Sequence, residues 1–108
     1  MTLLWIDDIR NPFLNVENKV PNCESIHWVL NYSQFILYIE KLGLPDVISF
    51  DHDLADIDDK SGYDCAKYLV DYCMDNNKRL PSFRVHSANP VGKENIEYLL
   101  NNFKRFNE

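Results

Sequence analysis

Three short, largely apolar runs that stop at carboxylate or imidazole side chains constrain the fold of this chain more than any other feature. A continuous apolar run of about four residues is typical of a strand buried on both faces of a parallel sheet. A run that alternates apolar and polar residues is typical of a strand with one wetter face. The runs and the residues that end them are 3–6 with Asp7 and Asp8, 47–50 with Asp51, His52 and Asp53, and the alternating 83–85 with His86.

Apolar residues between these runs recur at helical spacing, which predicts helices there. A further short strand is expected at 25–29. The first expected helix is 33–42, and Gly43 ends it. The second begins at the capping-box pattern of Ser61 and Asp64, and its apolar stripe consists of Cys65, Ala66, Leu69, Val70 and Cys73. The third begins at Asn89 as N-cap and Pro90, and its apolar face consists of Ile96, Leu99, Leu100 and Phe103.

Strands that alternate with helices predict an α/β fold with a mainly parallel sheet, and the wetter run at 83–86 is expected at its edge. A chain of 108 residues has the usual size of one domain, so we expect 1–108 to form a single domain. The segment 9–24 is rich in Asn and contains two prolines, which predicts a long irregular connection. Ligands bind beyond the carboxyl ends of parallel strands, where the polar residues that end the runs should converge.

The acidic composition limits the class of partner. A formal net charge of -6 without a cluster of Lys and Arg argues against binding to a long nucleic-acid duplex. A small phosphorylated ligand is compatible with this charge, because one or two cations and backbone amides can hold a phosphate group. The three cysteines are expected to be buried thiols, and the first apolar run is too short for a secretion signal or a membrane span. We therefore expect a cytoplasmic protein without a membrane partner.

Asp7, Asp8 and Asp51 are the expected ligands of a divalent cation. Carboxylates brought close together repel one another unless a cation lies among them. Mg²⁺ suits an oxygen-only set of ligands, whereas Mn²⁺ or Zn²⁺ becomes the better fit if His52 or His86 joins the set. A solvated turn after the first strand is the competing interpretation of Asp7 and Asp8.

His52 and His86 are the expected proton-transfer groups, because imidazole titrates near neutral pH. A histidine pair with a metal ion can activate water on one side of a phosphodiester and protonate the leaving oxygen on the other. For either histidine alone, a hydrogen bond to a backbone carbonyl is the competing interpretation.

The expected phosphate-binding residues lie around the start of the last helix, where backbone amides and the helix dipole attract anions. Ser87 and Asn89 precede that helix, and Lys93 lies in its first turn. Arg10, which follows the acidic pair, can clamp a phosphate through two hydrogen bonds. Simple N-capping by Asn89 and a surface position for Arg10 are the competing interpretations.

Four stretches carry a resemblance to known families: LWIDD at 4–8, FDHDL at 50–54, SGYD at 61–64 and HSANPVG at 86–92. The acidic pair, the aspartate after the third strand and the serine after the fourth resemble the receiver domains of response regulators. The four stretches together more closely resemble the cyclic-phosphate processing receiver-like family. This resemblance implies a receiver/flavodoxin-like three-layer sandwich. The four strands expected from the sequence form a short, mainly parallel sheet that lacks the fifth strand usual in receivers.

The site chemistry and this resemblance favour a metal-assisted phosphoesterase, a hydrolase that processes a cyclic phosphate on a nucleotide or RNA end. One alternative is an atypical receiver that is phosphorylated on Asp51 in signalling. Another follows from the resemblance of Asp51 and Asp53 to the DxD motif of haloacid dehalogenase phosphatases, with Asp51 as nucleophile and Asp53 as acid. A third is a module that binds a cyclic nucleotide without cleaving it. High Asn, Ile and Tyr usage is typical of AT-rich sources such as bacteriophages, for which the host cytoplasm is the expected location.

Overall fold

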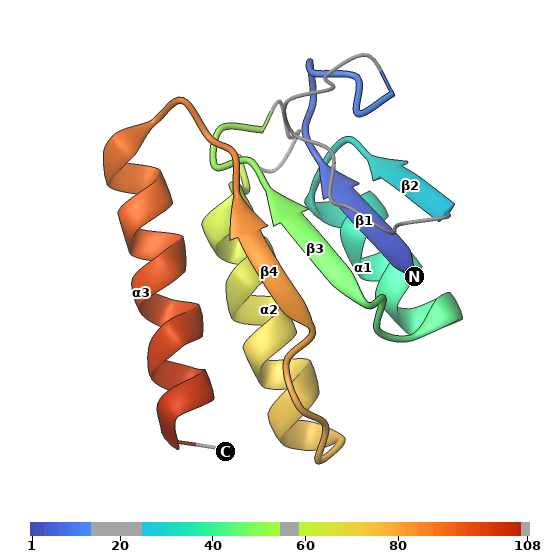
Figure 1. Cartoon of the computed structure of the whole chain (residues 1–108), viewed down its shortest axis with the longest axis vertical. Coiled ribbons are helices and arrows are strands. Elements are labelled where there is room, and N and C mark those ends of the chain that lie inside the picture. The colour runs from blue at the N-terminus through green and yellow to red at the C-terminus, as the bar shows by residue number, and fades with distance from the viewer. Residues whose placement is uncertain (14–24, 55–58, 107–108) are drawn as a thin grey trace.

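Strands and helices alternate along the chain in the computed structural model, which describes residues 1–13, 25–54 and 59–106. The α/β prediction is confirmed, while most of the predicted connection 9–24 lies outside the described residues. Figure 1 shows the elements in their arrangement. They are β1 (Thr2–Ile6), β2 (Ser25–Val29), α1 (Tyr32–Leu42), β3 (Val47–Phe50), α2 (Gly62–Asp75), β4 (Ser82–Val85) and α3 (Pro90–Phe106).

The four strands form one sheet in the order β2-β1-β3-β4, and every neighbouring pair is parallel. The register aligns Ile6 of β1 with Phe50 of β3, and Phe50 with Val85 of β4. All arrowheads in Figure 1 therefore point toward the same end of the sheet. The predicted parallel sheet and the edge position of β4 are both confirmed.

Local hydrogen bonds explain where the first two helices begin and end. The Asn31 side chain accepts from Gln34 N at 2.9 Å and caps α1. Gly43 ends this helix with φ 79°, a left-handed conformation that suits glycine. The predicted capping box is present at α2, where Asp64 Oδ2 accepts from Ser61 N at 2.8 Å.

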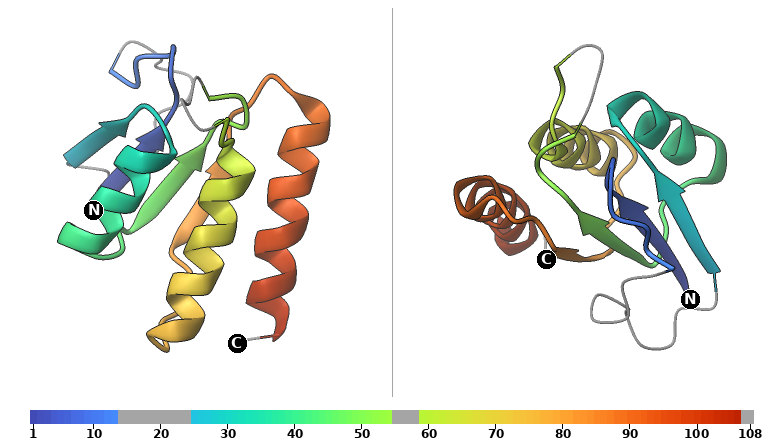
Figure 2. Two further views of the ribbon diagram at one scale, coloured as in Figure 1. Left: turned by 180° about the vertical axis from the view of Figure 1, so that it is seen from behind. Right: turned by 90° about the horizontal axis from the view of Figure 1, so that it is seen from above.

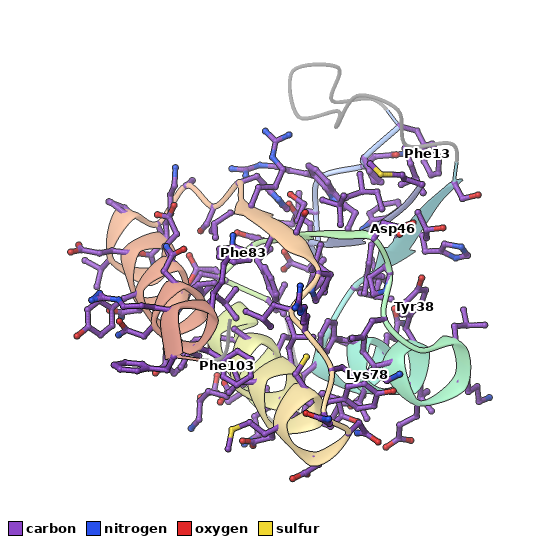
Figure 3. All side chains as sticks on the ribbon, turned by 60° about the horizontal axis from the view of Figure 1, so that its bottom comes forward. Phe13, Tyr38, Asp46, Lys78, Phe83 and Phe103 are labelled. Atoms are coloured by element: carbon purple, nitrogen blue, oxygen red, sulfur yellow. The ribbon has the colours of Figure 1, made fainter. Side chains whose placement is uncertain are left out.

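The main core lies between the sheet and the three helices. One buried cluster contains side chains from all four strands and from α1, α2 and α3, so the helices share one face of the sheet, as Figure 2 shows. Phe83 of β4 and Phe103 of α3 pack against this cluster (Figure 3). Cys65 and Cys73 are buried in it, as predicted, and Cys23 lies outside the described residues.

The opposite face of the sheet carries a smaller buried cluster of Leu3, Trp5 and Val47, with Ile26 and Trp28 packed against it. Within the three described ranges no helix lies on this face. The third layer of the expected sandwich is therefore not helical in that part of the chain. None of the helices in the described ranges combines the length and apolar character needed to cross a bilayer.

Candidate functional site

The carboxyl ends of β1, β3 and β4 meet at one edge of the sheet, as the sequence predicted. Backbone pairing continues one residue past the strands: Asp51 N donates to Ile6 O, and His86 N donates to Phe50 O, each at 2.9 Å. Asp7, Asp51 and His86 therefore follow one another across the sheet. Because side chains alternate along a strand, the side chains of all three residues leave the backbone on the sheet face opposite the helices.

Three carboxylates converge at this edge. Asp7, Asp8 and Asp51 each offer one oxygen, and the three oxygens lie within 4.8 Å of one another. A divalent cation fits such an oxygen-only set. The carboxylates border a recess of about 270 Å³ whose lining residues are Asp7, Asp8, Ile9, Arg10, Asp51, Asp53 and Ala88.

The electrostatics of Asp51 favour a cation in this recess. Only 8% of Asp51 is exposed. Burial is the largest cause that raises the pKa of its carboxyl above the ordinary value, and the Asp7 carboxylate raises this pKa further. Hydrogen bonds from the Ser87 side chain and the His52 backbone oppose the rise. A bound cation would remove the repulsion that the ionised Asp51 experiences here.

Asp7 is held in place from several directions. Its Oδ1 accepts hydrogen bonds from Ile9 N and Arg10 N, each at 2.9 Å, and its Oδ2 lies 3.0 Å from His86 Nε2. Only 1% of Asp7 is exposed. The predicted turn after β1 thus exists, but Asp7 is a buried anchor in it and not a solvated side chain.

His86 lies beneath this turn, stacked on Trp5 with a centroid distance of 3.8 Å and an interplanar angle of 8°. Its Nδ1 lies 2.7 Å from Ser49 Oγ, and its Nε2 faces Asp7. An ionised carboxylate only accepts hydrogen bonds, so Nε2 carries the proton and Nδ1 accepts from the Ser49 hydroxyl. Burial lowers the pKa of His86 to about 4 against the opposing effect of Asp7, which keeps the ring neutral near pH 7.

His52 occupies a different environment at the start of α3. Its Nδ1 lies 2.9 Å from Asp53 Oδ1, and 22% of its side chain is exposed. A Cβ added to Gly92 would lie 2.2 Å from His52 Cγ, so the ring rests directly on this glycine. The His52 hydrogen bond, followed by that of Asn89, lowers the pKa of Asp53. Proton transfer by His52 and by His86 stays a prediction.

The predicted phosphate-binding residues before α3 hydrogen-bond to each other, to the start of the helix and to the neighbouring aspartates. Ser87 Oγ accepts from Asn89 N at 3.1 Å, and Asn89 Oδ1 accepts from Gly92 N at 3.0 Å, which confirms the N-cap. Asn89 Nδ2 donates to Asp53 at 3.3 Å. Lys93 is exposed in the first turn of α3. Phosphate binding by these residues stays a prediction.

Arg10 is tethered at the edge of the recess. Its Nη1 donates to His86 O at 2.7 Å, and its own carbonyl oxygen accepts from Trp5 Nε1 at 2.9 Å. These bonds fix a cationic side chain beside the acidic cluster, where it also lowers the pKa of Asp51 slightly. Its predicted phosphate contact stays a prediction.

Sequence reasoning missed four residues that shape the site, namely Trp5, Trp28, Ser49 and Gly92. Ser49 is fully buried, and Trp28 Nε1 donates to Asp7 O at 2.7 Å. One signal for Ser49 was available, because it is the polar residue in an otherwise apolar buried strand. Trp5 and Gly92 lie in the stretches 4–8 and 86–92 that carry the family resemblance, but their contacts, like that of Trp28, join distant segments and could not be inferred from local sequence.

The depressed pKa of His86 predicts a specific loss of stability in acid. His86 takes up a proton near pH 6.5 in the unfolded chain but only near pH 4 in the folded protein. The contribution of neutral His86 to the free energy of unfolding is therefore complete above about pH 6.5 and declines as the pH falls toward 4. The decline amounts to roughly 3 kcal/mol. Urea unfolding across this range should show a steeper loss in the wild type than in His86→Gln, with His27→Gln, at an exposed strand position, as control. Parallel curves for wild type and His86→Gln would contradict this assignment.

Comparison with protein families gives a match to the cyclic-phosphate processing receiver domain over residues 2–102. A solved structure with a similar fold is a two-component response regulator of the LuxR family from Aurantimonas sp. SI85-9A1, with a TM-score of 0.62 and 13% sequence identity. The alignment covers 91% of this chain and 67% of that one. Comparison with curated proteins gave no match. The structural similarity supports the receiver-like fold expected from the sequence.

Proposed function

This chain belongs to the cyclic-phosphate processing receiver domain family, and we propose that it is a metal-assisted phosphoesterase that hydrolyses a cyclic phosphate on a nucleotide or RNA end. The convergence of the Asp7, Asp8 and Asp51 carboxylates in one recess carries the proposal. A cation held there, with Arg10 beside it, would supply the positive charge that a reacting phosphate group needs.

Asp8 and Asp51 are the proposed direct ligands of the cation. Asp7 is the most buried of the three and accepts three hydrogen bonds, so we assign to it the negative charge beside the cation and the fixing of the turn that carries Asp8. The raised pKa of Asp51 supports its role as a ligand, because a cation compensates the cost of its buried charge. Mg²⁺ or Mn²⁺ would supply neutralisation of the phosphate charge and a lowered pKa for the attacking water.

His52 is the proposed proton-transfer group. Hydrolysis adds water across one phosphorus–oxygen bond of the cyclic phosphate, so the water loses one proton and the leaving oxygen gains one. His52 Nδ1 donates to Asp53, which leaves Nε2 to accept the proton of the water. The leaving oxygen then takes a proton from the imidazolium or from solvent. Asp53 lines the recess and hydrogen-bonds to His52, which supports a role for this pair at the recess.

Phosphorylation of Asp51 is a second candidate, and one observation favours it. The Ser87 side chain hydrogen-bonds to Asp51, so a hydroxyl from the end of β4 lies beside the carboxylate. A receiver that is phosphorylated on aspartate would carry the phosphate at this position. The DxD alternative, with Asp53 as acid, passes through the same aspartyl phosphate before water releases it.

Turnover of defined cyclic phosphates tests the proposal. The protein is incubated with 2′,3′-cyclic AMP, 3′,5′-cyclic AMP and an RNA oligonucleotide with a 2′,3′-cyclic end, with Mg²⁺, with Mn²⁺ or with EDTA, and products are identified by ³¹P NMR. We expect a phosphomonoester only when a cation is present, and a loss of about 100-fold or more in His52→Ala but not in His27→Ala.

The other outcomes of this experiment separate the alternatives. An absence of product from every substrate would contradict hydrolysis. Cyclic nucleotide binding without product would favour the binding module. A mass increase of one phosphoryl group on Asp51 after treatment with acetyl phosphate, again without hydrolysis, would favour the signalling receiver.

A further inference from the structure

We infer that a largely buried support, made of Trp5, Trp28, Ser49 and His86, positions Asp7 in the wall of the recess, and that His86 is a positioning residue. We call these four residues the Asp7 support. Its link to a cation rests on the proposed function, whereas its effect on the turn after β1 does not. The support lies on the sheet face opposite the helices, where it joins β1, β2, β3 and the end of β4.

A side-chain relay forms the first part of the support. The Ser49 hydroxyl donates to His86 Nδ1 at 2.7 Å, and His86 Nε2 donates to Asp7 Oδ2 at 3.0 Å. Each group has one role, since the Ser49 proton fixes Nδ1 as an acceptor and leaves Nε2–H for the carboxylate. The other oxygen of Asp7 holds the backbone amides of Ile9 and Arg10. The relay therefore fixes the turn that leads into the recess.

The two tryptophans form the second part. Trp28 Nε1 donates to the carbonyl oxygen of Asp7 at 2.7 Å, and Trp5 Nε1 donates to that of Arg10 at 2.9 Å. Trp5 also stacks on the imidazole of His86. The two indoles thus hold the backbone at both ends of the Asp7 turn. Trp5 also limits rotation of the His86 ring, which holds the Asp7 side chain.

The burial of these polar groups argues that they serve more than packing. Ser49 is 0% exposed and the side chain of His86 is 1% exposed. An apolar residue in place of Ser49 would avoid the desolvation of a hydroxyl group, and buried polar networks contribute more to unique geometry than to net stability. The Ser49 and His86 side chains and both indole N–H groups lead to Asp7 or to its turn. The network ends on Asp7, which fixes the turn that carries the proposed ligand Asp8, and such indirect hydrogen-bonded support is what orients ligands in metal sites.

Hydrogen exchange and Mn²⁺ binding test the support independently. Ser49→Ala removes the hydroxyl, and Trp28→Phe removes one N–H while it keeps an aromatic ring. We expect the amides of Ile9 and Arg10 to exchange about fivefold faster in each variant. We also expect Mn²⁺ to bind about tenfold more weakly, measured by titration calorimetry.

A double-mutant cycle separates positioning through His86 from general destabilisation. Ser49→Ala should have almost no effect on Ile9 and Arg10 exchange in a His86→Gln background, because the relay is already broken. Val47→Ala is the matched control, since it truncates a buried residue of the same cluster that has no part in the relay. It should lower the unfolding midpoint without faster exchange at Ile9 and Arg10.

Two results would overturn the inference. One is unchanged exchange at Ile9 and Arg10 in Ser49→Ala, and the other is an equal effect of Ser49→Ala with and without His86. If the wild type binds no Mn²⁺, the cation in the proposed function fails, but the exchange experiment still decides on the support. Nitrogen-15 shifts of the His86 ring give a further check, because they should report a neutral ring protonated at Nε2.

Discussion

Asp51→Asn is expected to raise the thermal unfolding midpoint of the metal-free protein and to abolish the further rise that Mn²⁺ gives the wild type. The ionised Asp51 carboxylate is buried beside Asp7, so a neutral amide removes a cost of folding. The same substitution removes a proposed ligand. At a Mn²⁺ concentration 100 times the Kd, binding would stabilise the wild type by about 2.7 kcal/mol, and the variant would lose this gain. In thermal scans, Asp51→Asn should therefore have the higher unfolding midpoint with EDTA, and the wild type should have the higher midpoint with Mn²⁺.

The pH dependence of this effect follows from the raised pKa of Asp51. The folded protein holds the Asp51 proton more tightly than the unfolded chain, so the cost of the carboxylate is present above its folded pKa and disappears as the pH falls through it. The metal-free advantage of Asp51→Asn should shrink in acid accordingly. Asp71→Asn, at an exposed position of α2, is the matched control and should leave the unfolding midpoint unchanged both with Mn²⁺ and with EDTA. A Mn²⁺-induced rise that survives in Asp51→Asn would exclude Asp51 as an essential ligand.

Gly92→Ala is expected to reduce turnover by about 100-fold or more while the fold and Mn²⁺ binding persist. The added Cβ would lie 2.2 Å from His52 Cγ and 2.7 Å from His52 Cβ, so the imidazole must leave its place beside Asp53 and the first turn of α3 must move slightly away from residue 52. Loss of a positioned general acid or base typically costs two to four orders of magnitude in rate, about 10² to 10⁴. Alanine itself suits a helix better than glycine, which limits damage to α3. Steady-state kinetics, with Mn²⁺-induced stabilisation as a second measurement, checks both halves of this prediction.

Two comparisons make the Gly92→Ala result specific to His52. Val91→Ala alters the neighbouring residue, whose side chain is exposed, and should leave turnover unchanged. The double variant Gly92→Ala/His52→Ala should lose no more activity than His52→Ala alone, because both changes remove the same group. Full turnover in Gly92→Ala, or a further large loss in the double variant, would show that His52 does not act from its observed position.

The strands and the location of the site could be predicted because both follow from local patterns. Each apolar run stops at the residue where the parallel ladder ends, so Asp7, Asp51 and His86 had to reach the same edge of the sheet. The ends of the helices could also be predicted, because Gly43 and Asn89 act through their own short-range hydrogen bonds. The ends of the strands and helices depend on residues within about four positions of one another, which is the range that sequence patterns report.

The roles of the two histidines could not be predicted, because they depend on contacts across the sheet. His86 and His52 look alike in sequence, as single imidazoles just beyond a strand. The structure distinguishes them through Ser49 and Trp5, which enclose the first ring, and Gly92, which supports the second. Ser49, Trp5 and Gly92 are far along the chain from the ring that each contacts, whereas Asp53, the hydrogen-bond partner of His52, is its neighbour in sequence. The sequence predicted that Asp7, Asp8 and Asp51 would lie together, but it did not predict that Asp7 would be a buried anchor of the turn.

The position of a bound cation tests the central claim that the acidic recess is the functional centre. Crystals soaked in Mn²⁺, at a concentration that supports turnover, give an anomalous signal that locates the ion directly. We predict one peak within coordination distance of the Asp8 and Asp51 carboxylates, and its loss in Asp51→Asn crystals. A recess without a peak under these conditions, or a peak bound only at another place on the protein, would contradict the account.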